Sequence, residues 1–258
     1  MPHQKPYSPW LGAVIPLLAL AFWEFEGLVG ALPRYLPPPS AIGRELIAML
    51  ASGELFVHIG ASLFRALSGF AIGAVCGWFA GLLAGALRPV ERFYEPIISL
   101  TYPVPKIAAL PIVFAWFGLG NLSKIVIITV SVFYPLYIAT VAGAKATPRA
   151  YIWAARNMGA PKLTIILRVL SAAALPQIFN GLRIGLALSF VVMFVAEMVS
   201  SSEGLGYLIV FADQNERFDL VYVAIVTIGV IGFVADRVLL LIRKRLLVGQ
   251  LMATEFGR

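Results

Sequence analysis

Long runs of apolar residues, separated by short polar stretches, account for most of the chain. A helix needs about 20 mostly apolar residues to cross the roughly 30 Å hydrocarbon core of a bilayer. Runs of this kind predict six membrane-spanning helices, at residues 10–29, 63–87, 96–118, 122–143, 175–199 and 220–242. The pattern therefore predicts an all-α membrane protein in which residues 1–258 form one transmembrane domain.

The third run is the least regular of these. It is interrupted by Pro96, Pro103, Pro105, Pro111 and Lys106. A proline inside a helix removes a hydrogen-bond donor and clashes with the preceding turn. Irregular backbone at membrane depth is tolerated only inside protein or beside a water-filled cavity. We therefore expect this segment to line a translocation path or gate, and the candidate residues are Tyr102, Pro103, Pro105 and Lys106.

Basic residues gather on one side of the predicted membrane. Six spans place both termini on the same side, and that side carries Lys5, Arg88, Arg92, Lys145, Arg149, Arg156, Lys162, Arg168, Arg237, Arg243, Lys244, Arg245 and Arg258. The other side carries only Arg34, Arg44, Lys124 and Arg217. Because cytoplasmic loops collect Lys and Arg, we expect both termini to be cytoplasmic.

Two stretches outside the predicted spans have patterns of their own. Pro37-Pro38-Pro39-Ser40 predicts a stiff linker with Ser40 as a helix N-cap. The apolar residues that follow share one helical face, which predicts an amphipathic helix on the outer surface. They are Ile42, Leu46, Ile47, Met49 and Leu50. Residues 200–219 predict an acidic outer loop, which either receives a partner protein or is simply solvated.

Glycines recur at every fourth position of the second predicted span. They are Gly69, Gly73, Gly77, Gly81 and Gly85. Small residues at this spacing let the backbone of a second helix approach closely in a membrane. The stripe therefore predicts a packing face for another helix, within the chain or across a dimer. The alternative is a helix that merely tolerates glycine in a bilayer.

The overall composition favours the membrane interpretation. The chain is 60% hydrophobic and 13% charged, with a mean hydropathy of +0.89, whereas soluble domains average about 25% charged residues. The net charge of +7 fits basic cytoplasmic loops, so we expect no nucleic-acid partner. The single cysteine, Cys76, and the isolated histidines His3 and His58 predict neither an intrachain disulfide nor a metal site.

No catalytic motif is evident in the sequence. The chain has no GxxxxGK[ST] loop that would cradle ATP phosphates, no nucleophile elbow and no HExxH helix. We therefore expect a transport protein without a catalytic site of its own. An ATP-independent secondary transporter is the alternative, although such carriers usually show an internal repeat and ion-binding acids near the midplane.

Two charged residues lie within the fifth predicted span. Glu197 closes an otherwise apolar run, so it is either a translocation-path residue or a residue at the outer headgroup level. Arg183, near the inner end, either attracts an anion or extends its guanidinium to the interface. The neighbours Asp236 and Arg237 in the last span are expected to pair with each other.

A short basic segment, residues 148–163, separates the fourth and fifth spans. Thr147-Pro148 predicts a helix start with a hydroxyl cap, Gly159 predicts its end, and Pro161 begins the next helix. Small side chains at Ala154 and Ala155 would let this helix sit deep in a groove of another protein. The alternative is an interfacial helix held on anionic lipid by its arginines.

The pattern Ala154-Ala155-x3-Gly159, followed by a helix with Leu175-Pro176, resembles the E-A-A-x3-G loop of binding-protein-dependent ABC importer permeases. The resemblance to the nitrate, sulfonate and taurine group of these permeases extends over residues 31–45, 102–125, 180–198 and 204–245. It implies a type I ABC importer permease fold, in which residues 148–163 form a coupling helix that docks on an ATPase. The coupling residues it implies are Tyr151, Trp153, Ala154, Ala155, Arg156, Met158, Gly159 and Lys162.

The same resemblance implies the partners. They are a second copy of the permease, two cytoplasmic ATPase subunits that bind ATP and Mg, an extracytoplasmic solute-binding protein and membrane lipid. It also implies a bacterial inner-membrane location and inward transport, by alternating access, of a small anion such as nitrate, a sulfonate or taurine, or of a small heterocycle. No cofactor is expected in the chain itself. The chain departs from the family pattern at Trp153, where the family has glutamate, and at Ser171-Ala172, where it has an earlier Leu-Pro.

Overall fold

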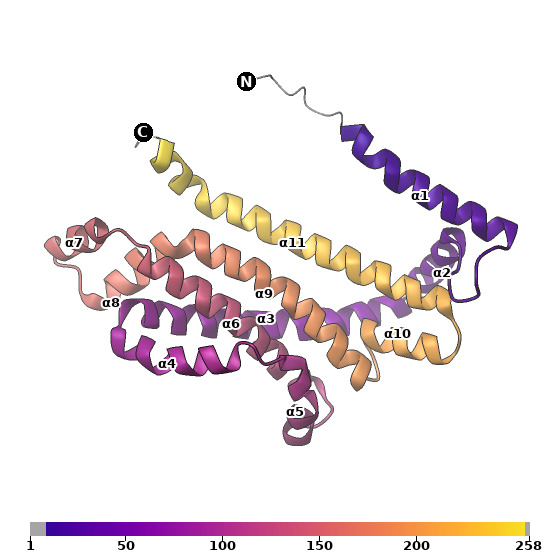
Figure 1. Cartoon of the computed structure of the whole chain (residues 1–258), viewed down its shortest axis with the longest axis horizontal. Helices are drawn as coiled ribbons and strands as arrows, with labels where there is room; N and C mark the ends of the chain where they lie inside the picture. Colours follow the sequence, from indigo (N-terminus) through magenta and orange to yellow (C-terminus); the bar gives the residue numbers. More distant parts are fainter. Residues whose placement is uncertain (1–8, 256–258) are drawn as a thin grey trace.

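The computed structural model describes residues 9–255, with side chains from 14 to 247, and contains only helices and connecting turns in this range (Figure 1). The helices are α1 (Pro9–Val29), α2 (Pro39–Ser52), α3 (Glu54–Ala86), α4 (Arg88–Thr101), α5 (Leu110–Phe117), α6 (Asn121–Lys145), α7 (Arg149–Asn157), α8 (Lys162–Thr164), α9 (Ser171–Val199), α10 (Leu205–Gln214) and α11 (Phe218–Glu255). A 3₁₀ turn, η1 (Lys106–Ala109), precedes α5, and a π-helical segment, η2 (Ile165–Leu170), precedes α9. The all-α prediction is confirmed for these residues, whereas Lys5, His3 and Arg258 lie outside them.

The long helices lie side by side in one bundle (Figure 1). The helix α6 packs between α3 and α9, and α11 runs along α9. The short helix α7 lies at one end of the bundle, and α2 and α10 lie at the other. The helix α1 stands away from the rest and touches it near α2, where the Trp23 ring meets the Tyr222 ring edge-on at 5.9 Å.

Four described helical stretches are long and apolar enough to cross a membrane, namely Glu54–Ala86, Asn121–Lys145, Lys162–Val199 and Phe218–Leu247. They contain the second, fourth, fifth and sixth predicted spans, and α1 covers the first. The stretch from Lys162 to Val199 is continuous, because η2 joins α8 to α9 without a break. The fifth span therefore begins directly after the turn that follows α7.

The third predicted span, residues 96–118, is not one continuous helix, as its prolines predict. The helix α4 ends at Thr101, and the pair formed by α4 and η1–α5 is bent by 87°. Pro103 and Pro105 account for the break, since neither can donate the backbone hydrogen bond that a continuing helix needs. Pro96 and Pro111 are accommodated, Pro96 inside α4 and Pro111 in the first turn of α5.

Residues 200–219, predicted as an acidic outer loop, contain the short helix α10. Its apolar side packs with α11 and with two residues of α2, Ile42 and Met49. Ile47 and Leu50 of α2 remain exposed, so the amphipathic face is narrower than predicted. The predicted cap at Ser40 does not form either: α2 starts at Pro39, and the Ser40 amide donates to a Glu24 carboxylate oxygen at 2.9 Å.

Two acidic side chains of this segment, Asp219 and Glu216, pair with arginines. Arg217 bridges Asp219, at 3.0 Å, and Glu45 of α2, at 3.1 Å. The hydrogen bonds from Arg217 to Asp219 are the main reason that the pKa of its guanidinium is raised. Glu216 pairs with Arg34 at 2.8 Å. These pairs tie α2 and the end of α1 to the turn before α11.

The glycine stripe of α3 lies directly against α6. A Cβ at Gly77 would lie 2.6 Å from the Phe133 carbonyl oxygen, and one at Gly73 would lie 2.6 Å from the Thr129 carbonyl oxygen. The other stripe positions meet α6 at similar distances: Gly69, Gly81 and Gly85. The partner of the stripe is thus within the chain. Bare backbone at these positions allows a contact that any side chain would prevent.

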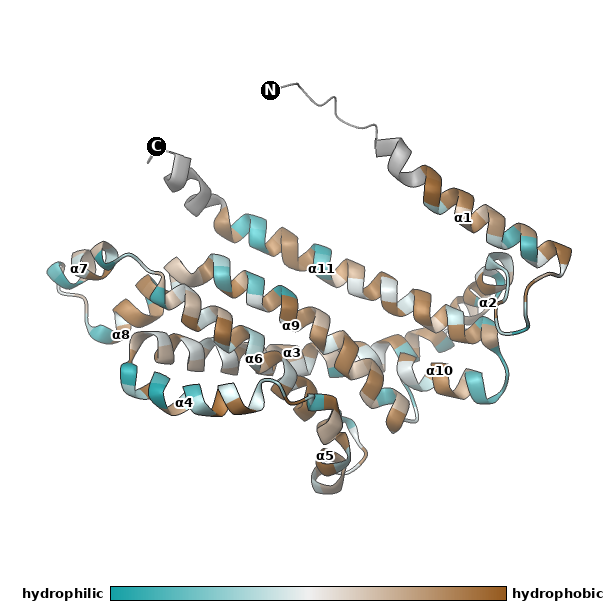
Figure 2. Ribbon diagram, viewed as in Figure 1, coloured by the Kyte–Doolittle hydropathy of each residue, from teal (hydrophilic) through white to brown (hydrophobic). Residues whose placement is uncertain are grey.

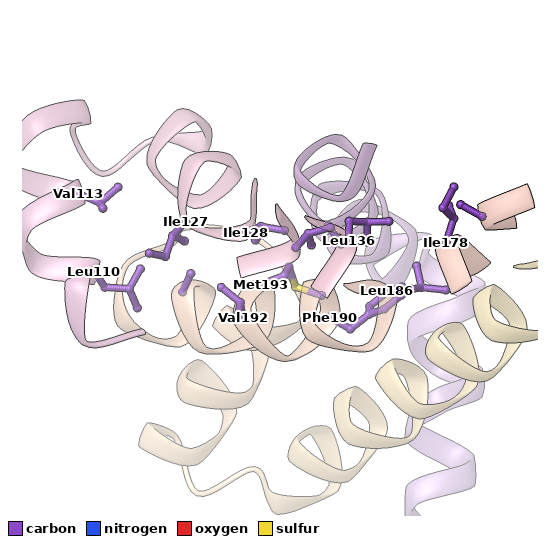
Figure 3. Close-up of a cluster of buried hydrophobic side chains, with 14 residues drawn as sticks. Leu110, Val113, Ile127, Ile128, Leu136, Ile178, Leu186, Phe190, Val192 and Met193 are labelled. Atoms are coloured by element: carbon purple, nitrogen blue, oxygen red, sulfur yellow. The ribbon is translucent and has the colours of Figure 1, made fainter. Parts of the chain in front are cut away.

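The core lies where α5, α6 and α9 meet (Figure 3). Ile128, Leu136 and Met193 are almost completely buried there, with Leu110 of α5 at its edge. The outer faces of α1 and α11 are also strongly apolar (Figure 2). Phe22 is 65% exposed and Phe233 is 58% exposed, as expected of helices that face lipid.

We expect Gly77→Ala to destabilise the bundle, because the added methyl meets α6 backbone that cannot move aside. Overpacking of this kind costs about 1–3 kcal/mol. Thermal unfolding of the detergent-solubilised chain measures the change. Gly60→Ala is the matched control on the same helix, since a Cβ there meets nothing within 4 Å; helix propensity makes it neutral or slightly stabilising. Equal effects of the two substitutions would contradict the packing role of the stripe.

Candidate functional site

A buried ion pair joins α3 to α9 near the end of the bundle that holds α10. Arg65 donates to a Glu197 carboxylate oxygen at 2.7 Å, and the two side chains are 4% and 0% exposed. Ser62, one turn before Arg65, donates to the same carboxylate at 2.8 Å. A buried carboxylate is tolerated when it is paired and hydrogen-bonded in this way.

The same cluster holds the start of α10. Three successive backbone amides donate to side chains of α3 and α9: Gly204 to His58 Nδ1 at 3.1 Å, Leu205 to Ser62 Oγ at 2.8 Å, and Gly206 to a Glu197 oxygen at 3.0 Å. The first amides of a helix have no partner within it. Gly204 has φ +116°, and a Cβ there would lie 2.5 Å from the Glu197 carboxylate. Only glycine fits this position.

The cluster extends to the start of α6. Arg65 Nε donates to Asn121 Oδ1 at 2.7 Å. Lys124, predicted as an outer-loop residue, is buried at 1% exposure and donates to the carbonyl oxygens of Leu119 and Gly120. The Glu197 carboxylate is therefore enclosed among α3, α9 and α10 and lines no open path in this conformation. No local sequence pattern marks the roles of Ser62, His58 and Lys124; the charge of Arg65 in a predicted span was the available signal.

The break between α4 and η1 borders a cavity of about 260 Å³. Tyr102 and Lys106 line it from the break, Ser131 and Tyr134 line it from α6, and α9 closes it. The Lys106 ammonium lies 4.2 Å from the Tyr134 ring centroid and donates to the Thr101 and Tyr102 carbonyl oxygens. Of the four predicted path residues in this segment, the structure thus brings Tyr102 and Lys106 to one cavity, and Pro103 and Pro105 shape the turn between them.

Arg183, the remaining path candidate, makes a two-pronged ion pair with Asp236 of α11. Its Nε and Nη2 atoms lie 2.7 and 3.1 Å from the two carboxylate oxygens. The predicted pair between Asp236 and Arg237 is therefore wrong. Neighbouring residues on a helix point in different directions, and Arg237 lies instead over the Phe233 ring at 4.7 Å. Arg183 thus fastens α9 to α11.

The helix α7 presents two different faces. Tyr151 and Trp153 are each 58% exposed, and Met158 is 81% exposed. Ala154, Arg156 and Lys162 are exposed as well. Ala155, by contrast, is 6% exposed and packs on the chain's own bundle, so its small side chain serves an internal contact rather than the expected partner groove.

The ends of α7 explain its sharp boundaries. Gly159 has φ +78°, its amide bonds to the Arg156 carbonyl, and the Ala160 amide bonds to the Ala155 carbonyl. This is the Schellman arrangement that ends many helices, and it favours glycine. The predicted hydroxyl cap at Thr147 does not form, because the Thr147 hydroxyl donates to the Gly143 carbonyl oxygen and no side chain caps α7.

Ser171, which stands where the family has its earlier Leu-Pro, forms a hydrogen bond between two helices. Its hydroxyl oxygen accepts a hydrogen bond from the Trp78 indole nitrogen at 3.2 Å, which joins the start of α9 to α3. Among the described residues, no group of three or more His, Cys, Asp or Glu side chains is placed to hold a metal ion.

The sequence matches the family model of binding-protein-dependent transport system inner membrane components over residues 73–248. It is 33% identical to the putative aliphatic sulfonates transport permease protein SsuC of Bacillus subtilis, covering 95% of this chain and 90% of that one. It is 31% identical to the taurine transport system permease protein TauC of Escherichia coli, again covering 95% of this chain and 90% of that one. A putative ABC transporter permease protein of Methanocaldococcus jannaschii, MJ0413, is 36% identical, covering 86% of this chain and 85% of that one.

We expect Glu197→Gln to destabilise the chain strongly, because it leaves the buried Arg65 guanidinium with only the partly exposed Glu203 carboxylate, at 3.5 Å, as a counter-charge. Removal of one partner of a buried pair costs about 3–5 kcal/mol. Thermal unfolding of the solubilised chain measures it. Glu216→Gln is the control: it breaks the pair with Arg34, whose side chains are 61% and 79% exposed, and should leave the midpoint almost unchanged. A midpoint for Glu197→Gln that equals that of the control would show that the pair does not hold the bundle.

Proposed function

The chain belongs to the family of binding-protein-dependent transport system inner membrane components, and we propose that it carries small sulfonates or related small anions inward by alternating access. As a member it is a multi-pass ABC transporter permease of the inner membrane, with an all-α type I permease fold. The proposal concerns what it moves and how the movement is driven. The sulfonate and taurine functions stated for SsuC and TauC support the choice of anion.

Energy for transport comes, in this proposal, from two cytoplasmic ATPase subunits that bind ATP and Mg. The observation that carries this step is the exposure of three large aromatic and apolar side chains, Tyr151 and Trp153 of α7 and Met158 directly after it. Exposed apolar side chains at the end of a membrane protein are suited to a protein groove. Trp153 and Arg156 take the place of the glutamate with which related permeases open this loop.

A movement of α7 would be transmitted directly to a membrane-spanning helix. After the turn at Gly159, the helical stretch Lys162–Val199 begins and continues along the bundle. Its first part includes the π segment η2, a wider helical form that often occurs at functional sites. A displacement of α7 would therefore displace α9, and α9 closes the cavity that Lys106 lines.

The proposed path runs along the exposed side of this cavity. Ile184, Leu188 and Val191 follow one another along α9 at helical spacing and line it, and Ile184 and Val191 are more than half exposed. A second copy of the chain placed against this face would enclose the path between the two permeases. Lys106 would then offer its positive charge to a passing anion. An extracytoplasmic solute-binding protein would deliver that anion at the end formed by α2 and α10.

Two substitutions test the coupling role of α7. Gly159→Pro forces φ near −65° where the backbone has +78°, and Trp153→Ala removes the largest exposed anchor. Truncation of a hot-spot side chain costs about 2 kcal/mol or more of binding free energy, which corresponds to about thirtyfold weaker binding to the partner. We expect solute-stimulated ATP hydrolysis and taurine uptake to fall at least tenfold in proteoliposomes that contain the ATPase and binding protein.

Trp116→Ala is the control for this experiment, because Trp116 is 75% exposed on α5, far from α7. It should leave the coupling of hydrolysis to uptake intact. Normal uptake in both α7 variants would mean that the helix only rests on lipid and does not dock on an ATPase.

Lys106→Gln tests the path. Loss of the positive charge should raise the KM for sulfonate uptake about tenfold or more, since a hydrogen bond to a charged group contributes about 1.5–3 kcal/mol. Lys106→Arg should retain part of the affinity, and Lys244→Gln in α11 is a control with the same change of charge. Unchanged uptake in Lys106→Gln, together with cysteines at Val104 and Ile107 that never react with aqueous thiol reagents, would exclude this cavity from the path.

A further inference from the structure

A second and larger cavity, of about 540 Å³, lies beneath the inner face of α7. Its walls come from four places: the turn between α3 and α4, the end of α6, the inner side of α7, and η2. All of these meet at the end of the bundle that carries α7 (Figure 1). Tyr151, Trp153 and Met158 of the proposed ATPase contact do not line this cavity, and only Arg156 is shared with it, so the cavity itself has no assigned role.

The cavity is strongly basic. Its cationic lining residues are Arg88, Lys145, Arg149, Arg156 and Lys162, and its acidic one is Glu91. Lys145 is paired with Glu91. The four other cations form no ion pair with any described residue. The cavity thus holds several positive charges without counter-charges, which favours an anionic occupant.

The remaining lining is apolar. Ile152 of α7 and Ile165, Ile166 and Leu170 of η2 contribute aliphatic side chains, and Leu87 adds another at the turn after α3. A small inorganic anion would leave this part of the cavity unmatched. A molecule with an anionic head and an aliphatic body would match both parts at once.

The position of the cavity fits such a molecule. The helices α3 and α6 end here, at Ala86 and Lys145, so the cavity lies at the level where a membrane-spanning bundle leaves the hydrocarbon. Basic pockets between membrane helices on the cytoplasmic side are suited to anionic headgroups. The excess of Lys and Arg at this end supports that orientation.

We infer that this cavity binds one anionic phospholipid of the phosphatidylglycerol type, with its phosphate among Arg88, Arg149 and the neighbouring cations. The acyl chains lie against the aliphatic wall. The lipid bridges the inner face of α7 to the ends of α3 and α6, so that a force on α7 is passed to the bundle. Binding itself does not depend on the proposed transport function, because it needs only the cavity and the membrane.

Native mass spectrometry of the full, detergent-solubilised chain tests this inference. The chain is titrated with phosphatidylglycerol, phosphatidylcholine and inorganic phosphate. We expect phosphatidylglycerol to be retained at least tenfold more strongly than phosphatidylcholine. The double variant Arg88→Gln with Arg149→Gln should weaken phosphatidylglycerol binding about thirtyfold, because one basic residue near an anionic surface contributes about 1 kcal/mol.

The matched control is Arg92→Gln with Arg168→Gln, which removes the same charge from exposed positions outside the cavity lining. It should retain wild-type binding. Equal retention of the two lipids, an equal loss in the control, or inorganic phosphate that displaces phosphatidylglycerol at equal concentration would overturn the inference. Since no ATPase or solute is present, failure here is distinct from failure of the transport proposal, which the uptake assays test.

Discussion

The close contact between α3 and α6 is the constraint on which the rest of the structure depends. Lipid tails are as apolar as leucine, so helices in a membrane associate through close packing rather than through a hydrophobic drive. The glycines of α3 allow that packing, with carbonyl oxygens of α6 lying where a Cβ would be. Once α6 is fixed, Tyr134 stands beside the broken third span, and the end of α6 stands beside α7. The interface between α3 and α6 thus positions both the proposed path beside Lys106 and the proposed coupling helix α7.

The sequence predicts this structure well wherever a local pattern carries the information. Apolar runs located the long helices, the four-residue spacing located the stripe, and Gly159 located the end of α7. Contacts between residues that are far apart in the sequence produce no local pattern of this kind. Arg65 and Glu197 are 132 residues apart, and the pairing of Arg183 with Asp236 rather than Arg237 with Asp236 depends on which helices become neighbours. The helix α10 was missed because its apolar side is too short to resemble a span.

The sequence of α7 suggested two alternatives, docking in a groove of another protein or binding to anionic lipid. Trp153 and Met158 are exposed and available to a protein, whereas Ala155 is buried and Arg149, Ile152 and Arg156 border the basic cavity. Sequence periodicity places both faces on one helix but does not say which face meets the bundle. Docking on a protein and contact with lipid are compatible in this structure, because the two proposed contacts rest mainly on different side chains.

The anchoring of α10 has a practical consequence for following the transport cycle. Three adjacent amides donate hydrogen bonds to three side chains on two long helices, so α10 cannot slide along this end of the bundle independently of α9. Asp213, near its far end, is exposed and forms no ion pair with a described residue. A spin label or fluorophore attached at that position would report the displacement of α9, without any modification of the proposed path beside Lys106.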